Sequence, residues 1–323
     1  MNQFSDEKIR ISYGTGIVLG LIKARQDVAP TTAYLLWDKG CIGSCSFCPR
    51  ANGNQREERL SRIIWPEYSF KQILELLTSQ PKPFERVCLQ TGFNPDKTGQ
   101  LKVLAQTLVK NGLTTSVTLS PSQTDLALEL LDYGIDHIGI GLDGASENTY
   151  SLHKRKNWHE DWPKLLQLIS KAKEKIEVHL IYGLGDSEEA FCKTISAIID
   201  AGGRISLFAL TPVNGGNPPD LSEYRRIQIF RYLYENSRIN LDQCNFDGEK
   251  LVAIKTGKQP AIEMLDSGAC FRTSGCGNCN RPYYNEKPGQ KFFNFPRSLT
   301  AEEFSLALDE SGLFNSDFIG QQD

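Results

Sequence analysis

Short apolar runs alternate with amphipathic stretches between about residues 30 and 215 of the chain. The runs that predict strands cover residues 33–37, 86–90, 116–120, 137–142, 178–182 and 205–211. The stretches that predict helices cover residues 70–77, 101–110, 123–131, 164–173 and 188–199. This alternation predicts βαβ units and therefore a parallel sheet. The strands have nearly continuous apolar cores, as expected when helices cover the sheet.

The six units predict an α/β fold, a partial (β/α)6 TIM-like barrel with a C-terminal cysteine-containing extension. The expected boundaries are a helical N-terminal segment over residues 1–29, the barrel over 30–216 and the extension over 217–323. In barrels of this kind the chemistry gathers at the C-terminal ends of the strands.

Composition is that of an ordinary globular protein, with 40% hydrophobic and 23% charged residues among 323. A formal net charge of −3 gives no electrostatic reason to expect nucleic acid or an anionic membrane as a partner. The longest uncharged apolar stretch, residues 16–22, is too short to span a bilayer. The polar first eight residues favour a cytoplasmic location.

Three cysteines follow the first predicted strand within eight residues: Cys41, Cys45 and Cys48, spaced C-x3-C-x2-C. Thiolates this close on one loop can converge on one metal centre, and three ligands leave a coordination position open for a small molecule. The alternatives are a zinc site or a disulfide. In the cytoplasm clustered cysteines more often bind metal, and so tight a loop is unfavourable for disulfide geometry.

This motif, with Phe47 in its aromatic position, resembles C-x3-C-x-aromatic-C of the radical S-adenosylmethionine (radical SAM) superfamily. The resemblance implies a 4Fe–4S cluster on these cysteines, with S-adenosylmethionine chelated at the open iron. It also implies one-electron cleavage to a 5′-deoxyadenosyl radical, driven by a reductant such as ferredoxin or flavodoxin.

The same resemblance implies that S-adenosylmethionine contacts lie at the strand ends. The superfamily's Gly-Gly-Glu motif is absent after the second strand, where the turn carries Gln90, Thr91 and Gly92 instead. The other implied contacts are Phe47, Ser120, Asp143, Ile181, Gly183 and Thr211. Simple turns or helix caps remain the alternatives at residues 90–92, Ser120 and Asp143.

Two further features of the barrel region are expected to have other roles. His179 should face the barrel interior, as a packing or substrate-orienting residue. The basic stretch over residues 152–156 is most simply a solvated face or a partner-docking patch.

A second group of cysteines, Cys270, Cys276 and Cys279, has the spacing C-x5-C-x2-C in the C-terminal extension. It predicts a second, auxiliary 4Fe–4S cluster, with zinc as the alternative. Cys244 is a candidate fourth ligand. Cys88 and Cys192 are predicted to be core residues, since an isolated cysteine usually behaves as a small hydrophobe.

The block from Thr273 to Gly289 resembles the tail of biotin-synthase-related radical SAM proteins, a group that includes the prokaryotic two-component lipoyl synthases. This resemblance implies sulfur insertion into octanoyl groups on a lipoyl-carrier protein, a lipoyl synthase-like transferase activity, with a homologous radical subunit as partner. One alternative is a radical SAM enzyme of other chemistry, whose auxiliary cluster relays electrons or binds substrate. The other is a non-catalytic iron–sulfur or zinc scaffold.

Overall fold

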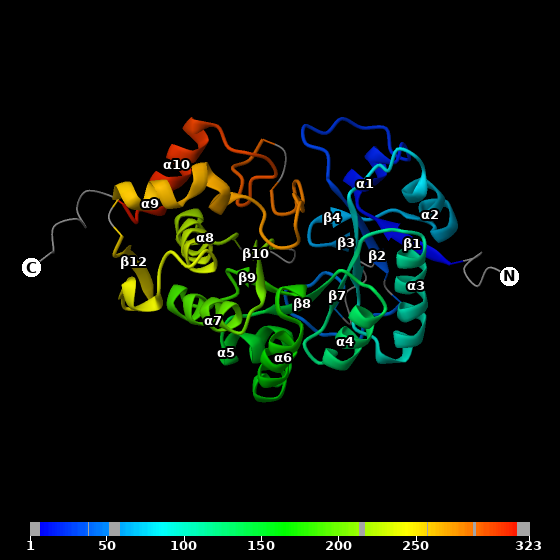
Figure 1. Ribbon diagram of the computed structural model, residues 1–323, viewed down its shortest axis with the longest axis horizontal. Helices are drawn as coiled ribbons and strands as arrows, with labels where there is room; N and C mark the ends of the chain where they lie inside the picture. Colours follow the sequence, from blue (N-terminus) through cyan, green and yellow to red (C-terminus); the bar gives the residue numbers. More distant parts are fainter. Residues whose placement is uncertain are drawn as a thin grey trace, which may run out of the picture.

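The computed structural model describes residues 7–37, 39–51, 59–212, 217–256, 258–286 and 289–314. Within them, eight strands form one sheet in the order β10-β9-β8-β7-β6-β2-β1-β5 (Figure 1). Its parallel strands are β2 (Thr32–Trp37), β6 (Arg86–Thr91), β7 (Thr115–Leu119), β8 (His137–Asp143), β9 (Ile176–Tyr182) and β10 (Arg204–Ala209). They coincide with the six predicted runs and confirm the α/β class with a partial barrel.

Helices join successive parallel strands and bury their apolar sides on the outer face of the sheet. The main connecting helices are α2 (Phe70–Thr78), α3 (Thr98–Lys110), α4 (Thr124–Asp132), α6 (Trp158–Ala172) and α7 (Glu188–Asp200). Helix α6 begins earlier than predicted because the Asn157 side chain accepts a hydrogen bond from the His159 N–H and caps it. The shorter helical turns are η1 (Pro95–Lys97), α5 (Glu147–Thr149), η2 (Tyr150–Lys154), η3 (Lys173–Lys175) and η4 (Leu241–Gln243).

Successive residues of a parallel strand face the helices and the barrel interior in turn. The prediction of nearly continuous apolar strands did not include this alternation. On β9, Val178 and Leu180 belong to the core beneath the helices, whereas His179 and Ile181 line the barrel interior. On β8, Gly141 and Asp143 line the interior in the same way. The inner face therefore carries polar and small residues, and it is available for binding.

The N-terminal segment contains a strand as well as the predicted helix. Strand β1 (Lys8–Ile11) pairs antiparallel with β2 and with β5 (Glu67–Ser69), and helix α1 (Tyr13–Val18) follows it. A separate hairpin joins β3 (Arg59–Leu60) to β4 (Ile63–Ile64). The expectation of a purely helical segment over residues 1–29 was thus incomplete, because β1 extends the barrel sheet.

The C-terminal extension packs helix α8 (Leu221–Glu235) against α7 and against α10 (Ala301–Ser311). The extension also contains β11 (Cys244–Asp247), β12 (Lys250–Ile254), α9 (Lys258–Met264) and η5 (Asp266–Phe271). Helix α8 carries Arg226, whose guanidinium pairs with the buried Glu188 at 2.6 Å and so ties the extension to α7. None of the helices in the described ranges combines the length and apolar character needed to cross a membrane.

A loop of the extension, residues 272–286, crosses from one side of the open barrel to the other. At β10 the Ser274 hydroxyl accepts a hydrogen bond from the Leu207 N–H at 2.9 Å. At the start of β2 the Asn280 amide oxygen accepts from the Thr31 N–H at 3.0 Å. In Figure 1 this orange segment lies above β10, facing the blue N-terminal part of the chain. The loop thus covers the opening that a six-stranded partial barrel leaves.

Candidate active site at the carboxyl end of the barrel

A cavity of about 230 Å³ lies at the C-terminal ends of the parallel strands. The described residues that line it include most positions predicted for cofactor binding: Cys41, Cys45, Phe47, Cys48, Gln90, Thr91, Gly92, Ser120, Asp143, Ile181 and Thr211. The fold therefore brings together residues that lie up to 170 positions apart in the sequence (211 − 41 = 170).

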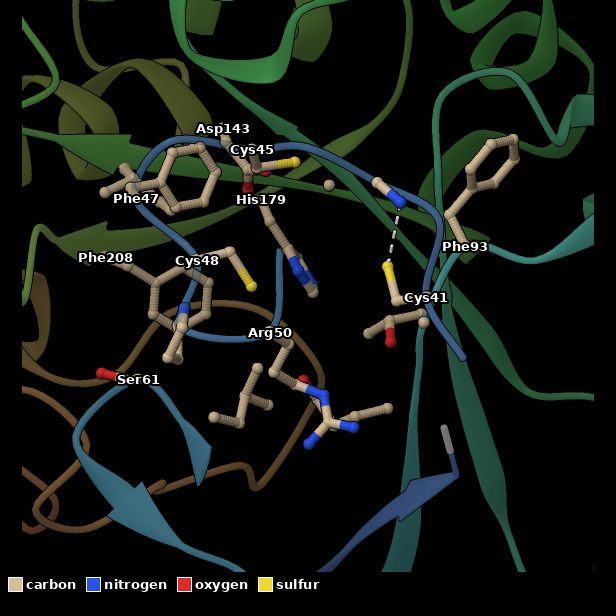
Figure 2. Close-up of a pocket in the computed structure, with 18 of the residues that line it drawn as sticks. Cys41, Cys45, Phe47, Cys48, Arg50, Ser61, Phe93, Asp143, His179 and Phe208 are labelled. Carbon is tan, nitrogen blue, oxygen red and sulfur yellow. Dashed lines mark hydrogen bonds between the residues drawn. The ribbon is translucent and has the colours of Figure 1, made fainter. Parts of the chain in front are cut away.

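The loop with the first three cysteines lies over this cavity (Figure 2). A Cβ atom on Gly43 would lie 3.3 Å from the Cys41 sulfur and 4.0 Å from the Cys45 sulfur. The loop is held from the next strand end, since the Ile42 N–H donates to the Phe93 carbonyl oxygen at 2.9 Å. Glycine at position 43 thus keeps the space between two of the sulfurs free.

The π-helical turn η2 anchors the other end of the cysteine loop. The Ser46 hydroxyl lies 2.6 Å from His153 Nδ1, and the Ser46 N–H donates to the His153 carbonyl oxygen at 2.9 Å. This corrects the interpretation of residues 152–156 as a solvated face or docking patch. Only part of that stretch is exposed, since Lys154 and Lys156 line the cavity and His153 holds the cysteine loop.

Asp143 forms an ion pair with Lys154 at the cavity wall. The Lys154 ammonium lies 2.6 Å from Asp143 Oδ2, and their side chains are only 10% and 12% exposed. Burial alone would lower the pKa of Lys154, but the negative charges of Asp143 and Cys45 raise it above its usual value. Lys154 thus provides a fixed positive charge beside the cysteine loop. Asp143 does not cap the following helix, because Ser146 does so.

The cysteine thiols are shielded from water. Burial raises the pKa of Cys48 to about 11 and also raises that of Cys45, which Lys154 in turn lowers. Because metal binding requires thiolates, occupancy by a metal must displace protons from these groups.

Aromatic and cationic side chains form the inner end of the cavity. The Arg281 guanidinium lies 4.1 Å from the ring centre of Tyr284 and 4.9 Å from that of Phe208. His179 faces the cavity, as expected, and contacts the Phe208 ring edge to face at 5.4 Å. Burial lowers the pKa of His179, which keeps its imidazole neutral at physiological pH.

Residues 38–198 match the Radical SAM superfamily. This chain belongs to the radical SAM superfamily. It is 26% identical over 169 residues to the biotin synthase of Marinobacter nauticus, an alignment that covers 50% of this chain and 46% of that protein. The chain thus spans about half the length of the curated relative it matches.

Two solved structures of the FeFe-hydrogenase maturase HydG share the fold. One has a TM-score of 0.51 and 13% identity, covering 63% of this chain and 50% of HydG. The other, from Carboxydothermus hydrogenoformans, has a TM-score of 0.50 and 15% identity, covering 86% of this chain and 66% of that one.

Membership in the radical SAM superfamily implies a 4Fe–4S cluster and S-adenosylmethionine, and the residues present fit both. Cys41, Cys45 and Cys48 would hold three irons, with the space around Gly43 kept free between sulfurs. Among the described residues, no three His, Cys, Asp or Glu side chains are placed to share one metal ion. A 4Fe–4S cluster has a different requirement, because each of its cysteines binds a different iron.

When bound, the cluster and S-adenosylmethionine supply a 5′-deoxyadenosyl radical by one-electron cleavage. Around them, the residues of this chain line the cavity with both polar and aromatic side chains. Lys154, Asp143 and Ser120 supply polar groups, and the aromatic side chains include Phe208 and Tyr284. Such a lining suits a ligand that has a charged methionine end and a flat adenine end.

Gly183 was predicted to contact the cofactor as well. Of the predicted contacts in the described ranges, it alone does not line the cavity. Its φ of +107° favours glycine, and a Cβ there would lie 3.0 Å from Pro219 and 3.1 Å from Leu210. Local packing therefore accounts for this glycine. The turn that follows the predicted contact Thr211 is described only to Pro212, and residues 213–216 lie outside the described ranges.

Among the cavity residues that were missed from the sequence, four carry polar or charged groups discussed above: Lys154, Lys156, Arg281 and Tyr284. The two lysines lie in a stretch whose basic character suggested solvent exposure. Arg281 and Tyr284 come from the C-terminal extension, and no local pattern indicated that it would reach into the barrel. The signals in that region were the spacing of the second cysteine group and the resemblance of the block from Thr273 to Gly289, and neither indicated this contact.

Proposed function

We propose that this radical SAM enzyme inserts sulfur at unactivated carbons, as a lipoyl synthase-like sulfurtransferase acting on a protein-bound octanoyl group. The relation to biotin synthase supports sulfur insertion, since biotin contains sulfur bonded to saturated carbons. Unactivated C–H bonds have no acidic proton for a side chain to remove, so a radical cofactor must carry the difficult step. An inserted sulfur also needs a source, for which we propose the auxiliary 4Fe–4S cluster.

The observation that carries this proposal is a second set of thiols directly behind the cavity. Gln90 lines the cavity, and its amide nitrogen donates to the Cys88 sulfur at 3.0 Å. Its amide oxygen accepts from Arg281 at 3.2 Å. Cys279 packs against the same small apolar cluster as Cys88. One layer of side chains therefore separates the cavity from these thiols, which supports a sulfur source next to the radical site.

The cavity residues support chemistry on an aliphatic chain. Phe208, Tyr284 and Ile181 provide apolar walls that would exclude water from a reactive carbon radical. The neutral imidazole of His179 lies within these walls and adds no charge to them. A saturated chain is the kind of substrate that such walls favour.

The proposed partners follow from the same activity. We propose ferredoxin or flavodoxin as the electron donor, a lipoyl-carrier protein as the substrate and a homologous radical subunit as a co-catalyst. The cytoplasm, where reductants keep thiols available for iron–sulfur clusters, is the proposed location.

The test uses anaerobically reconstituted protein with S-adenosylmethionine, reduced flavodoxin and an octanoylated lipoyl-carrier domain. Mass spectrometry would quantify 5′-deoxyadenosine and sulfur added to the octanoyl chain. The assay is run with and without the candidate partner subunit, and Cys45→Ala is the control that should form neither product. Reconstitution with isotopically labelled sulfide would place the label in the product if the protein's own cluster is the sulfur source.

Two outcomes would contradict sulfur insertion. Formation of 5′-deoxyadenosine without sulfur transfer, to this substrate or to related acyl chains, would favour a radical enzyme of other chemistry. Failure of the reduced, loaded protein to cleave S-adenosylmethionine in any combination would favour a non-catalytic iron–sulfur scaffold.

A further inference from the structure

Three thiols lie inside the barrel behind the cavity: Cys88 beside the Gln90 amide, Cys276 beside Glu177, and Cys279 beside the Tyr34 hydroxyl. We propose that Cys88, Cys276 and Cys279 are the cysteine ligands of the auxiliary iron–sulfur cluster, in place of the set that includes Cys270. This inference rests on the proposed function, because it names the ligands of the cluster from which the sulfur would come.

The strand pairing brings Cys88 and Cys279 to the same place. Cys88 on β6 is paired in register with Tyr34 on β2. The Tyr34 hydroxyl lies 3.2 Å from the Cys279 sulfur. Both cysteines pack against one apolar cluster, made of Tyr34, Leu36 and Trp65. A strand residue and a residue 191 positions later (279 − 88 = 191) are thus neighbours inside the barrel.

Gly275 brings Cys276 to the same region. A Cβ atom at position 275 would overlap the carboxylate of Glu177 and the hydroxyl of Ser206, and its φ is +117°. Only glycine lets the loop approach β9 and β10 this closely. The Cys276 thiol then donates to Glu177 Oε2 at 2.7 Å. The loop is therefore built to insert Cys276 into the barrel.

Backbone and side-chain contacts place the three thiols in one region. The Cys279 N–H donates to the Cys276 carbonyl oxygen at 3.1 Å, so these two cysteines share one turn of the loop. The Cys279 sulfur lies beside the Tyr34 hydroxyl, and Tyr34 is the in-register neighbour of Cys88. Thiolates beside the buried Glu177 carboxylate would be costly on their own, whereas a bound metal would compensate for their negative charge.

Two arginines supply positive charge around this group. Arg86, at the start of β6, is 8% exposed, and its Nη1 has no hydrogen-bond partner within the described part of the chain. Its Nη2 pairs with the Asp136 carboxylate, which leaves Nη1 as the end of the guanidinium without a partner among the described residues. Arg281 lies over the Tyr34 ring at 5.5 Å. A cluster held by three thiolates is anionic, and these two cations would offset its charge.

The other cysteines of the extension have different surroundings. Cys270 is fully buried in η5, within the core that α8 shares. Cys244 lies near Cys192, again in the apolar core. Both residues are thus accounted for as packing groups.

The experiment isolates the second site by working in the Cys41/Cys45/Cys48→Ala background. Iron, zinc and acid-labile sulfide are measured after anaerobic reconstitution, together with the Mössbauer spectrum. The background protein should retain about four irons, the content of one 4Fe–4S cluster. Adding Cys88→Ala or Cys276→Ala should reduce the iron to near zero. Adding Cys270→Ala or Cys192→Ala, the matched controls, should leave it unchanged.

A folding control accompanies each variant. Cys88→Ser keeps the side-chain size, and far-ultraviolet circular dichroism with gel filtration shows whether the barrel remains intact. Loss of iron from a folded Cys88→Ser variant supports Cys88 as a ligand.

The contrary results separate the two proposals. Iron lost with Cys270→Ala but kept with Cys88→Ala would overturn the ligand set and leave sulfur insertion standing. A background protein that binds no iron, or binds zinc instead, would overturn both the site and its role as sulfur source. Cleavage of S-adenosylmethionine by the otherwise wild-type chain would be unaffected by either result.

Discussion

The ammonium of Lys154 lies 2.6 Å from the carboxylate of Asp143, with both side chains nearly buried beside the cysteine loop. Both residues have an unusual backbone: Asp143 has a φ of +69°, and Lys154 belongs to a π-helical turn. Left-handed backbone at an aspartate and a π-helical turn both recur at functional sites. The pair therefore couples the end of β8 to the turn that anchors the cysteine loop.

Removing one member of this pair should destabilise the protein and weaken cofactor binding. Lys154→Met leaves the Asp143 charge buried and unpaired, which should lower the free energy of unfolding by on the order of 3 kcal/mol. Affinity for S-adenosylmethionine should fall at least tenfold. Urea unfolding of the apo protein and equilibrium dialysis would measure the two effects. Lys171→Met, at an exposed position of α6, is the control and should change neither; equal effects in both variants would contradict the role of the pair.

The hydrogen bond between His153 and Ser46 should affect retention of the cluster. His153→Ala removes the 2.6 Å side-chain contact but keeps the backbone hydrogen bond to Ser46. A loss of about 1 kcal/mol, typical of one hydrogen bond, corresponds to about fivefold faster release of iron to a chelator. The control is His159→Ala, because His159 also pairs with a side chain, Glu147, but is 75% exposed. No difference between the two variants would contradict the anchoring role.

The barrel strands were predictable from sequence because each has a local signal. The six apolar runs were identified to within about two residues at each end, the intervening helices were found with less exact starts, and the cysteine loop followed the first run as expected. The ends of these strands must meet in any barrel, so Ser120, Asp143 and Ile181 could be placed together without coordinates. Strand β1 was missed since its pattern is short and its partners, β2 and β5, are distant in sequence.

The arrangement of Cys88, Cys276 and Cys279 behind the cavity was not predictable, for a different reason. Cys88 has the pattern of a core strand residue, and only the C-terminal loop shows that it faces other thiols. By spacing, Cys270 belongs to one motif with Cys276 and Cys279. However, the helical turn η5 ends at Phe271, after Cys270 and before Cys276, and the Cys270 side chain is buried in the core. Spacing along a chain indicates which cysteines can converge, whereas the fold decides which of them do.

Stability should depend on pH through Glu303 at the N-terminus of α10. Its carboxylate pairs with Arg297 and accepts from the Thr300 N–H, and these hydrogen bonds, despite some desolvation, lower its pKa to about 2. A lowered carboxyl pKa adds stability that is present above the unfolded value of 4.5 and is lost as pH falls toward about 2. Because the group is largely solvated, screening limits this to about 1 kcal/mol or less.

Glu303→Gln tests that dependence, since glutamine keeps the capping acceptor and removes the charge. Its unfolding midpoint in urea should be lower than that of the wild type at pH 7, and the difference should vanish near pH 2. The matched variant Glu302→Gln, one residue earlier in the same helix, should show no such convergence. If the difference in unfolding midpoint between Glu303→Gln and the wild type persisted at pH 2, the effect would come from packing rather than from charge.

Substitutions in the two groups of cysteines should affect two different reactions. Cys45→Ala should abolish cleavage of S-adenosylmethionine, because it removes a ligand of the radical cluster. Cys276→Ala should keep uncoupled formation of 5′-deoxyadenosine and stop formation of the sulfur-containing product. Chromatographic quantification of both compounds from one reaction would measure this. An unchanged product yield in Cys276→Ala would show that the auxiliary site is not the source of sulfur.

Arg281 lies between the two sites, and its substitution should uncouple them. Its guanidinium stacks on Tyr284 and bonds to Gln90, which in turn bonds to Cys88. Arg281→Gln should leave cleavage of S-adenosylmethionine within about twofold of wild type. Sulfur transfer should fall at least tenfold, because a desolvated cation–π contact contributes about 2 kcal/mol and the Gln90 contact is lost with it. Arg281→Lys keeps the positive charge but lacks the planar guanidinium, so sulfur transfer should stay low in this variant. Full activity in the lysine variant would mean that charge alone, and not the stacked geometry, connects the cavity to the thiols below it.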